Sequence, residues 1–293
     1  MTEAKKASGK FSDVIIASDM DGTFLGPRAS LVERNLRAIE YFISEGGHFT
    51  FATGRNHIQL LHSMPKAPEI VNMPVVACNG ASLYDLSAMR EEKGYLIDYS
   101  VVRELSEFLA SESDTVGIRC GTDRKFLYDR LTNYFIKMDH DYNPGSEVAP
   151  VSAWASYPIY KLAVRDTEEI LCRLRPMMEE RFAGRLEITQ SATTLIDIQT
   201  AGRTKAVLLS ELVASFGRPM TLCVAGDYDN DLEMLSIADL PVCPENAVPA
   251  VKAICKHCFC HHKDGVIADL IEFLDKDARG CEDACHFSFK KEK

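Results

Sequence analysis

The chain has 293 residues, 46% of them hydrophobic, which is enough for one large or two ordinary domains with a substantial core. Its formal net charge of −10 at pH 7 argues against a protein that binds nucleic acid or a membrane surface, because those polyanions would repel it on average. No apolar stretch follows the N-terminal lysines as in a signal peptide, and none approaches the ~18 residues that span a membrane. These features predict a cytoplasmic protein.

The first part of the chain alternates expected strands and helices. Residues 13–18 predict a buried strand and residues 30–47 a helix, and two further strands are expected at 48–53 and 74–79. The last third repeats this order, with expected elements at 204–217 (helix), 221–226 (strand), 230–238 (helix) and 264–276 (helix). Strands and helices that alternate with short links are typical of a parallel sheet covered by helices.

The middle of the chain has a different pattern. Within residues 83–197 the apolar stretches are shorter, polar segments separate them, and several expected strands surround one charged helix. We therefore expect an α/β protein whose Rossmann-like parallel-sheet core is formed by residues 11–82 and 198–276. An α+β domain at 83–197 would be inserted between these halves, and residues 1–10 and 277–293 would be solvated tails.

Four short polar features lie where expected strands end or where the following helix begins. They are Asp19 with Asp21, Thr53 with Gly54, Lys205, and the acidic run GDYDND at residues 226–231. Ligands gather at the carboxyl ends of the strands in open α/β sheets, so we expect these features to converge.

The charge of these features predicts a cation and a phosphoryl group. So many carboxylates in one place are not tolerated without a cation, and oxygen ligands without histidine favour a hard ion such as Mg²⁺. The threonine hydroxyl and the lysine suit a phosphoryl group. One aspartate of the first pair could attack phosphorus while the other moves the proton, which would explain their two-residue spacing.

The sequence resembles the phosphatases of the haloacid dehalogenase (HAD) superfamily, and within them the Cof-type branch (subfamily IIB), over nearly all of residues 13–276. The resemblance rests on five motifs in the family's order: SDMDGTFL, ATGR, ACNGASLYD, GRTKAVLL and GDYDNDLEML. One departure is the lysine motif, which usually reads Gly-Val-Ser-Lys-Gly and here reads Gly-Arg-Thr-Lys-Ala. The resemblance implies the HAD fold, with a cap inserted after the third core strand.

Matched position by position, the resemblance implies a role for each motif. Asp19 would be the nucleophile that becomes an aspartyl phosphate, and Asp21 would be the general acid and base. Mg²⁺ would be held by the carboxylates of Asp19 and Asp227 and by the backbone carbonyl of Asp21. The phosphate or substrate would be bound by Thr53, Gly54, Arg55, Lys205 and Asn230, with Asp231 and Thr23 as supporting residues. Asp229 matches a variable position, and we expect it to be exposed.

The expected function is a Mg²⁺-dependent phosphatase that acts on a small phosphorylated metabolite. A sugar phosphate is the commonest substrate of this branch, and a phosphorylated cofactor such as pyridoxal phosphate is the second. A phosphomutase of the same superfamily and a non-enzymatic phosphate-ligand sensor stay open as alternatives, as does the oligomeric state. No nucleic-acid or membrane partner is expected. Specificity would come from the cap, where candidate substrate contacts are Arg119, Asp123, Lys125, Tyr128 and Asp197.

The ten cysteines lie mostly in expected strands and helices, where cysteine is a small apolar filler, so we expect reduced thiols. The stretch CKHCFCHH at 255–262 could suggest zinc, together with Cys281, Cys285 and His286. We favour a short core strand there, with Cys258 and Cys260 on one buried face. No role is expected for three histidines that lack the partner pattern of a catalytic base: His48, His57 and His62.

Overall fold

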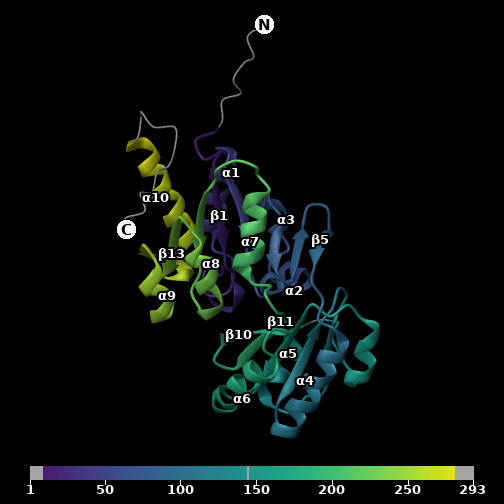
Figure 1. The fold of residues 1–293 in the computed structure, drawn as a ribbon. Coiled ribbons are helices and arrows are strands. Elements are labelled where there is room, and N and C mark those ends of the chain that lie inside the picture. The colour runs from purple at the N-terminus through teal and green to yellow at the C-terminus, as the bar shows by residue number, and fades with distance from the viewer. Residues whose placement is uncertain (1–8, 144, 281–293) are drawn as a thin grey trace.

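The structure is a computed structural model that describes residues 9–143 and 145–280. It has two lobes, which we call the core and the cap (Figure 1). Within these ranges every helix is too short or too polar to span a membrane. The expected tails lie largely outside the described residues. Helix α10 (Val266–Gly280), however, runs beyond the boundary expected at residue 277.

A five-stranded parallel sheet forms the centre of the core, with the strand order β14-β13-β12-β1-β2. Its strands are β1 (Val14–Ser18), β2 (His48–Phe51), β12 (Thr221–Ala225), β13 (Leu240–Pro244) and β14 (His257–Phe259). β1, β12 and β13 are buried along their whole length, as strands covered on both faces must be. β3 (Val75–Ala77) joins β2 through a bridge between Ala52 and Val76. The predicted parallel-sheet core is confirmed.

Helices cover both faces of this sheet. Successive residues of β1 point to opposite faces, and each face packs against a different helix. Ile16 packs in one apolar cluster with Ile39 of α1 (Glu33–Ser44), and Ile15 packs in another with Leu209 of α7 (Lys205–Ala214). The remaining core helices are α2 (His57–Ser63), α3 (Ala67–Ile70), α8 (Leu232–Ser236) and α9 (Pro249–Ile254). Short 3₁₀ turns are η1 (Pro27–Ala29), η2 (Cys78–Gly80), η4 (Asp229–Asp231) and η5 (His262–Asp264).

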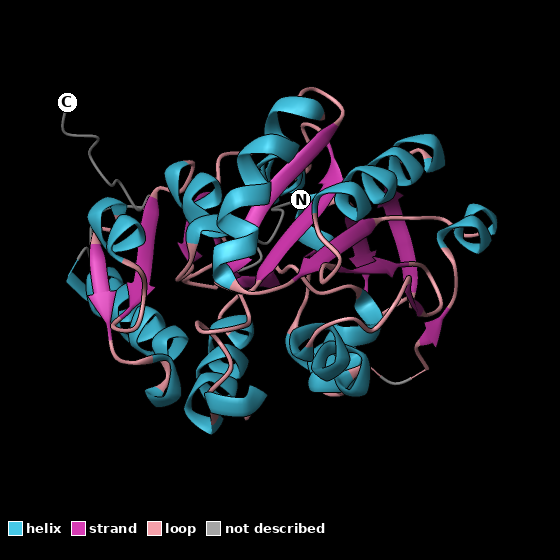
Figure 2. Cartoon of the chain, turned by 90° about the horizontal axis from the view of Figure 1, so that it is seen from below, coloured by secondary structure: helices cyan, strands magenta, loops and turns pink. Residues whose placement is uncertain are grey.

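The cap is built on one six-stranded, mainly antiparallel sheet with the order β10-β11-β9-β6-β7-β8. Its strands are β6 (Gly117–Gly121), β7 (Phe126–Tyr128), β8 (Glu147–Val148), β9 (Lys161–Arg165), β10 (Leu186–Ala192) and β11 (Leu195–Thr200). Figure 2 views the molecule from below, with these strands in magenta and the helices in cyan. The helical segments of the cap are α4 (Tyr99–Glu112), α5 (Tyr134–Tyr142), α6 (Glu168–Arg181) and η3 (Val151–Ser156).

The two faces of the cap sheet differ in polarity, because side chains alternate along each strand. Ile118 and Val164 lie on the face that packs into the apolar cluster with α4 and α6. Arg119, Lys161 and Asp197 lie on the opposite face, where they contact α5 or the core. This face therefore carries buried charged side chains, beside Phe126 and Tyr128, which pack in an apolar cluster with Ile58 of α2.

The predicted boundaries between core and cap need correction at both ends. β4 (Ser82–Asp85) pairs antiparallel with β3, and β5 (Arg90–Gly94) pairs antiparallel with β4. Both strands extend the core, although all of their residues except Ser82 lie within the expected cap at 83–197. Leu83 and Tyr84 accordingly pack in the core clusters. On the return, β11 stays in the cap sheet through Thr200, beyond the expected start of the core at 198. Cross-strand hydrogen bonds decide these boundaries, and the pattern of apolar stretches does not reveal them.

Gly80→Ala is expected to destabilise the protein more than an ordinary glycine substitution. Gly80 has φ +101°, and an added Cβ would lie 2.2 Å from the carbonyl oxygen of Thr204, just before α7. The clash adds to a left-handed strain of roughly 1–2 kcal/mol. Gly184→Ala is the matched control, since Gly184 has φ +72° and no heavy atom within 4 Å of an added Cβ. The midpoint of thermal unfolding should fall further for Gly80→Ala, and equal shifts would contradict the clash.

Candidate functional site

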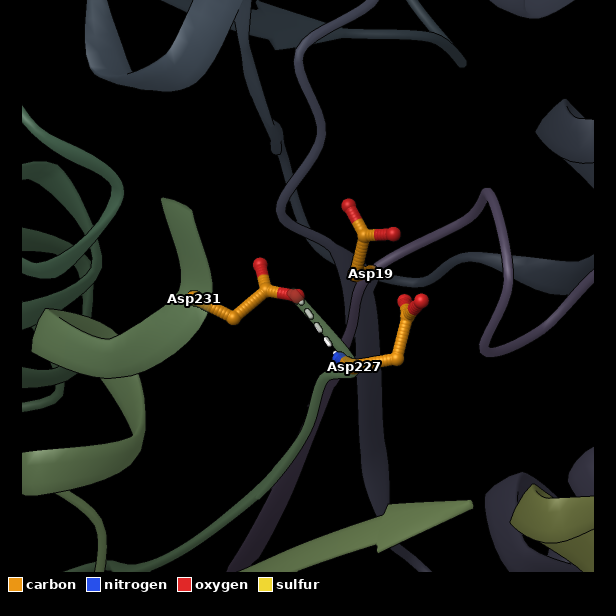
Figure 3. A group of neighbouring side chains, drawn as sticks. All are labelled: Asp19, Asp227 and Asp231. Atoms are coloured by element: carbon orange, nitrogen blue, oxygen red, sulfur yellow. Dashed lines mark hydrogen bonds between the residues drawn. The ribbon is translucent and has the colours of Figure 1, made fainter. Parts of the chain in front are cut away.

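Three aspartates meet at the carboxyl ends of β1 and β12. Asp19 follows β1, and its backbone N–H continues the strand ladder by donating to the carbonyl of Ala225 at 2.9 Å. Asp227 follows β12, and Asp231 ends η4. Carboxylate oxygens of the three aspartates lie within 4.8 Å of one another (Figure 3). The fold thus brings Asp19 together with the acidic run.

A buried lysine bridges two of these carboxylates. Lys205, the first residue of α7, donates to Asp19 at 2.6 Å and to Asp231 at 2.8 Å. Its side chain is 1% exposed, so water does not compete for these bonds. Burial lowers the pKa of Lys205, but the two carboxylates outweigh this effect and hold the pKa above its ordinary value. The other oxygen of Asp231 accepts from the backbone N–H groups of Asp227 and Tyr228, which fixes the loop after β12.

The turn after Asp21 fits closely around Asp227. Thr23 donates its hydroxyl to Asp227 at 2.7 Å, as a supporting residue would. Gly22 has φ +82°, and a Cβ there would lie 2.3 Å from a carboxylate oxygen of Asp227. Glycine is therefore required at this position both by its backbone conformation and by the close approach.

The cluster carries more negative charge than its lysine neutralises. Burial raises the pKa of Asp19 to about 7, although Lys205 opposes the shift. Burial also raises the pKa of Asp227 to about 8, and repulsion from Asp19 and Asp231 adds to it. A divalent cation would relieve this excess charge. Carboxylate oxygens are the ligands that a hard cation such as Mg²⁺ prefers, so Asp19 and Asp227 fit the chemistry expected of metal ligands.

The side chain of Asp21 points to Arg55 rather than to this cluster. It is 57% exposed, and its two oxygens accept from Nε and Nη2 of Arg55, both at 2.6 Å. Arg55 also contacts Ser63 of α2 and, at 3.4 Å, the hydroxyl of Tyr142 in the cap. Burial lowers the pKa of Arg55, but Asp21 holds it above its ordinary value. The residue expected at the substrate thus pairs here with the expected general acid and base.

The loop of Thr53 and Gly54 is held between the ends of β2 and β3. The N–H of Thr53 donates to β3 at 2.8 Å, and its carbonyl accepts from the N–H of Asn79 at 2.9 Å. The Thr53 hydroxyl accepts from the N–H of Arg55 at 3.1 Å, which orients the turn. Asn230 reaches the same place from η4, with its amide nitrogen 3.5 Å from Oδ1 of Asn79. Asn79, for which the sequence predicted no role, therefore links this loop to the acidic run.

A buried ion pair of the cap reaches this loop. Lys161 at the start of β9 donates to the carbonyl of Gly54 and to Asp197 of β11, both at 2.6 Å. Asp197 also accepts from Asn79 at 2.9 Å, so cap and core share one hydrogen-bond network. A Cβ on Gly54 would lie 3.0 Å from Asn79 and 3.3 Å from both Asp197 and Lys161. Sequence reasoning missed Lys161, whose only signal was a lysine at a strand position that alternates with the apolar ones.

The other cap residues that the sequence suggested as substrate contacts do not contact the loop of Thr53 and Gly54 by a hydrogen bond that the structure records. Arg119 and Tyr128 bind Asp139 of α5 at 2.7 and 2.9 Å, inside the cap. Lys125 pairs with Glu147 near the surface. Asp123 lines a cavity between cap and core. Of the five candidates, Asp197 is the one bonded to Asn79 beside the loop.

The stretch at 255–262 contributes an edge strand to the core sheet. β14 pairs Cys258 with Cys243 of β13, but Cys258 is exposed because β14 is an edge of the sheet, so the expected burial of Cys258 is wrong. Within the part of the chain that the structure describes, the three-aspartate cluster is the one group of acidic, cysteine or histidine side chains close enough to share an ion. The eight cysteines described are free thiols. The other candidate zinc ligands lie outside the described residues: Cys281, Cys285 and His286.

Comparisons with known proteins identify the family of the chain. The family of haloacid dehalogenase-like hydrolases matches residues 16–271, and the chain belongs to this family. It is 29% identical over 252 residues to the pyridoxal phosphate phosphatase YbhA of Escherichia coli, covering 82% of this chain and 90% of that protein. It is 27% identical over 275 residues to the 5-amino-6-(5-phospho-D-ribitylamino)uracil phosphatase YitU of Bacillus subtilis, covering 89% and 97%.

Solved structures with a similar fold come from other proteins. SMU.1108c from Streptococcus mutans aligns with a TM-score of 0.80 at 23% identity, covering 89% of this chain and 98% of that one. BT1666 from Bacteroides thetaiotaomicron, a phosphatase of this superfamily, aligns with a TM-score of 0.75 at 21% identity, covering 94% and 98%. The protein is a phosphoric monoester hydrolase of the HAD superfamily, Cof type.

Lys161→Met is expected to weaken turnover of phosphate esters although Lys161 does not touch Asp19. The change removes the donor that holds the Gly54 carbonyl and leaves the buried charge of Asp197 unpaired. We expect kcat/KM for a chromogenic aryl phosphate to fall by about 10- to 100-fold, as for other small misplacements of binding groups. Lys125→Met, which breaks a surface pair of the same domain, is the control and should change kcat/KM by less than about twofold. Equal effects would contradict a role of Lys161 at the loop.

Mg²⁺ is expected to stabilise the protein more at about pH 8 than at about pH 5.5. The pKa values of Asp19 and Asp227 are raised to about 7 and about 8, so the folded protein keeps protons that the unfolded chain has already lost. Without a cation, the contribution of these two groups to the free energy of unfolding is therefore largest at low pH. It is lost as the pH rises through about 7 and about 8. The gain in thermal midpoint on adding Mg²⁺ should therefore grow with pH, and Asp227→Asn should reduce it. A gain that is independent of pH would contradict binding at these carboxylates.

Proposed function

We propose that the protein is a Mg²⁺-dependent phosphatase that hydrolyses a small phosphorylated metabolite through an aspartyl phosphate on Asp19. The observation that carries this proposal is the Lys205 bridge between Asp19 and Asp231, with Asp227 beside it. A lysine that pairs with a carboxylate at the carboxyl ends of parallel strands can bind a phosphoryl oxygen and orient that carboxylate toward phosphorus. Membership of the hydrolase family supports the same reaction.

Asp19 would supply the nucleophile and Asp21 the proton. The Asp19 carboxylate attacks phosphorus, the bond from phosphorus to the leaving oxygen breaks, and Asp21 gives that oxygen a proton. Asp21 then takes a proton from water, and the water oxygen attacks phosphorus and releases inorganic phosphate and the free carboxylate of Asp19. Both oxygens of Asp21 accept from Arg55 in this structure, so Asp21 would turn from Arg55 to reach the leaving oxygen.

The other site residues would bind and orient. Mg²⁺, when held by Asp19, Asp227 and the backbone carbonyl of Asp21, supplies positive charge against the phosphoryl oxygens. The residues that would bind the phosphoryl group itself are Thr53, Gly54, Lys205 and Asn230, with Arg55 available from the same turn. Asp231 would support them by holding Lys205 and the loop after β12.

The names of the relatives bear on the substrate. YbhA acts on pyridoxal phosphate, and YitU acts on a phosphorylated ribitylamino uracil. Both compounds contain a nitrogen heterocycle with hydrogen-bonding groups. We place a metabolite of this kind ahead of the sugar phosphate expected from the sequence. The cytoplasmic location stays a prediction.

A phosphomutase is the second candidate, and it would need cations for a second phosphate. The basic residues on the core-facing side of the cap sheet are already engaged, Arg119 and Arg165 by Asp139 and Lys161 by Asp197. This pairing favours hydrolysis. Release of inorganic phosphate from a hexose phosphate would distinguish a phosphatase from a mutase. A sensor without activity would be expected to lack one of the catalytic carboxylates, and the chain has all of them.

Asp19→Asn is expected to lower the turnover of an aryl phosphate by at least about a thousandfold, because the amide cannot act as the nucleophile. EDTA should have a comparable effect on the unmodified protein, and Mg²⁺ should reverse it. Asp229→Asn is the matched control, since Asp229 belongs to the same acidic run but is exposed. Phosphate release is the measurement. Full activity of Asp19→Asn, or full activity in EDTA, would contradict the proposed function.

A further inference from the structure

Three cysteines lie against one another at the edge of the core sheet. Cys243 in β13 is the register partner of Cys258 in β14, and the side chains of such a pair in parallel strands point to the same face. Cys255 ends α9 and packs against Cys243 in the apolar cluster on that face. β13, α9 and β14 follow one another along the chain, so each of these elements brings one thiol to the same place.

Hydrogen bonds connect the three thiols, from Cys258 to Cys243 and from Cys243 to Cys255. The bond from Cys243 lowers the pKa of the Cys255 thiol and outweighs the opposing effect of burial. The three thiols also differ in access, since Cys243 is buried, Cys255 is half-buried and Cys258 is exposed. Cys255 therefore combines a lowered pKa with access to solvent, which are the two properties of a reactive thiol.

Cys255 is a better disulfide partner for Cys243 than Cys258 is. A disulfide needs Cβ atoms that lie about 3.5–4.5 Å apart. Neighbouring strands lie about 4.7–4.9 Å apart, and the Cβ atoms of a register pair keep about that distance because their side chains run parallel. Cys255 stands at the end of a helix that packs on β13, so the spacing of the strands does not hold its Cβ away.

The segment from β13 to α9 supports two residues of the acidic site. Asn246 donates from Nδ2 to the carbonyl of Gly22 at 2.7 Å. The N–H of Val248 donates to the carbonyl of Asp227 at 3.0 Å. The two thiols stand at the two ends of this segment, so a bond between them would close a ring that contains both contacts.

We propose that Cys243 and Cys255 form a reversible disulfide when the protein meets hydrogen peroxide, and that this bond weakens the binding of Mg²⁺ at Asp19 and Asp227. The effect on Mg²⁺ rests on the function proposed above, whereas the disulfide does not. Bonded sulfur atoms lie much closer than thiols that share a hydrogen bond, so β13 and α9 have to approach each other. The segment between them then shifts, and its support of the turn at Gly22 and of Asp227 weakens.

The oxidation takes place in two balanced steps. The thiolate of Cys255 attacks one oxygen of the peroxide, the O–O bond breaks, and the leaving hydroxide takes up a proton to become water, which leaves Cys255 as a sulfenic acid. Sγ of Cys243 then attacks Sγ of Cys255, the S–O bond breaks, and the leaving hydroxide takes the proton of the Cys243 thiol. Two thiols are oxidised to a disulfide and one peroxide is reduced to two water molecules. A dithiol reverses the reaction by exchange.

Peptide mapping of the unmodified protein tests for the bond. Trypsin cleaves after Lys252, Lys256 and Lys263, so the three cysteines fall on three different peptides. After stoichiometric peroxide and blocking of the remaining thiols, we expect the peptide AICK to be linked to the peptide that ends at Lys252. Fragmentation should place the link at Cys243 rather than at Cys223, which packs on the other face of the sheet. A link to the peptide HCFCHHK instead, or no link that dithiothreitol removes, would overturn the proposal.

The Mg²⁺ concentration for half-maximal turnover of an aryl phosphate tests the effect on the metal site. We expect it to rise by at least about fivefold after peroxide, as on the loss of groups that support metal ligands, and to return with dithiothreitol. Cys255→Ser should keep the value of the reduced protein, and Cys255→Ala, which keeps the site apolar, should behave in the same way. Cys172→Ser, at an exposed cysteine of the cap, is the control and should respond to peroxide as the unmodified protein does.

The two measurements separate failure of this inference from failure of the proposed function. If an aryl phosphate is hydrolysed but the link is absent or leaves the Mg²⁺ dependence unchanged, the inference is overturned and the phosphatase stands. If Cys255→Ser and Cys172→Ser respond to peroxide alike, another thiol is responsible, and the inference is again overturned. If no phosphate ester is hydrolysed while the mapped link forms, the proposed function is overturned and the disulfide stands.

Discussion

The burial of three carboxylates around one ammonium group is the constraint on which the rest of the core depends. Removing Asp19, Asp227 and Asp231 from water is costly, and Lys205 offsets only part of that cost. Adjacent strands β1 and β12 deliver the carboxylates to one place, and Thr23 and backbone N–H groups bind their outer oxygens. The negative charge that remains is what a divalent cation would neutralise.

The cap, like the core, buries charged groups against groups of opposite charge. Charged side chains lie on its core-facing side, and they are buried as ion pairs, Lys161 with Asp197 and Arg119 with Asp139. Such pairs add little to the free energy of unfolding, but removing one partner is costly, so they fix the relative placement of the groups they join. Because Lys161 also holds the Gly54 carbonyl, the placement of the cap and that of the loop depend on each other.

The sequence predicted those parts of the fold and site whose signal is local. Asp19, Thr53 and Lys205 stand where an apolar strand ends or a helix begins, and the structure places them there. Lys161 could not be found in this way, because its partner Gly54 is 107 residues away and nothing in its own strand marks it. Likewise β14 was expected but the exposure of Cys258 was not, since a strand pattern does not tell an edge from the centre of a sheet.

The ion pair between Arg55 and Asp21 is a feature of the site that the sequence does not reveal. Sequence reasoning placed Arg55 at the substrate, but here both oxygens of Asp21 accept from its guanidinium group. In this arrangement the guanidinium group holds both oxygens of Asp21, so the carboxylate is turned to Arg55 and away from Asp19 and Asp227. A phosphoryl group bound at the adjacent Thr53–Gly54 turn, as proposed, would be an anion and would compete with Asp21 for the same guanidinium group. The contact needs only core residues, while Tyr142 adds a partner from the cap. Release of Asp21 would therefore follow the arrival of the phosphate itself, and the cap would adjust how firmly Arg55 is held.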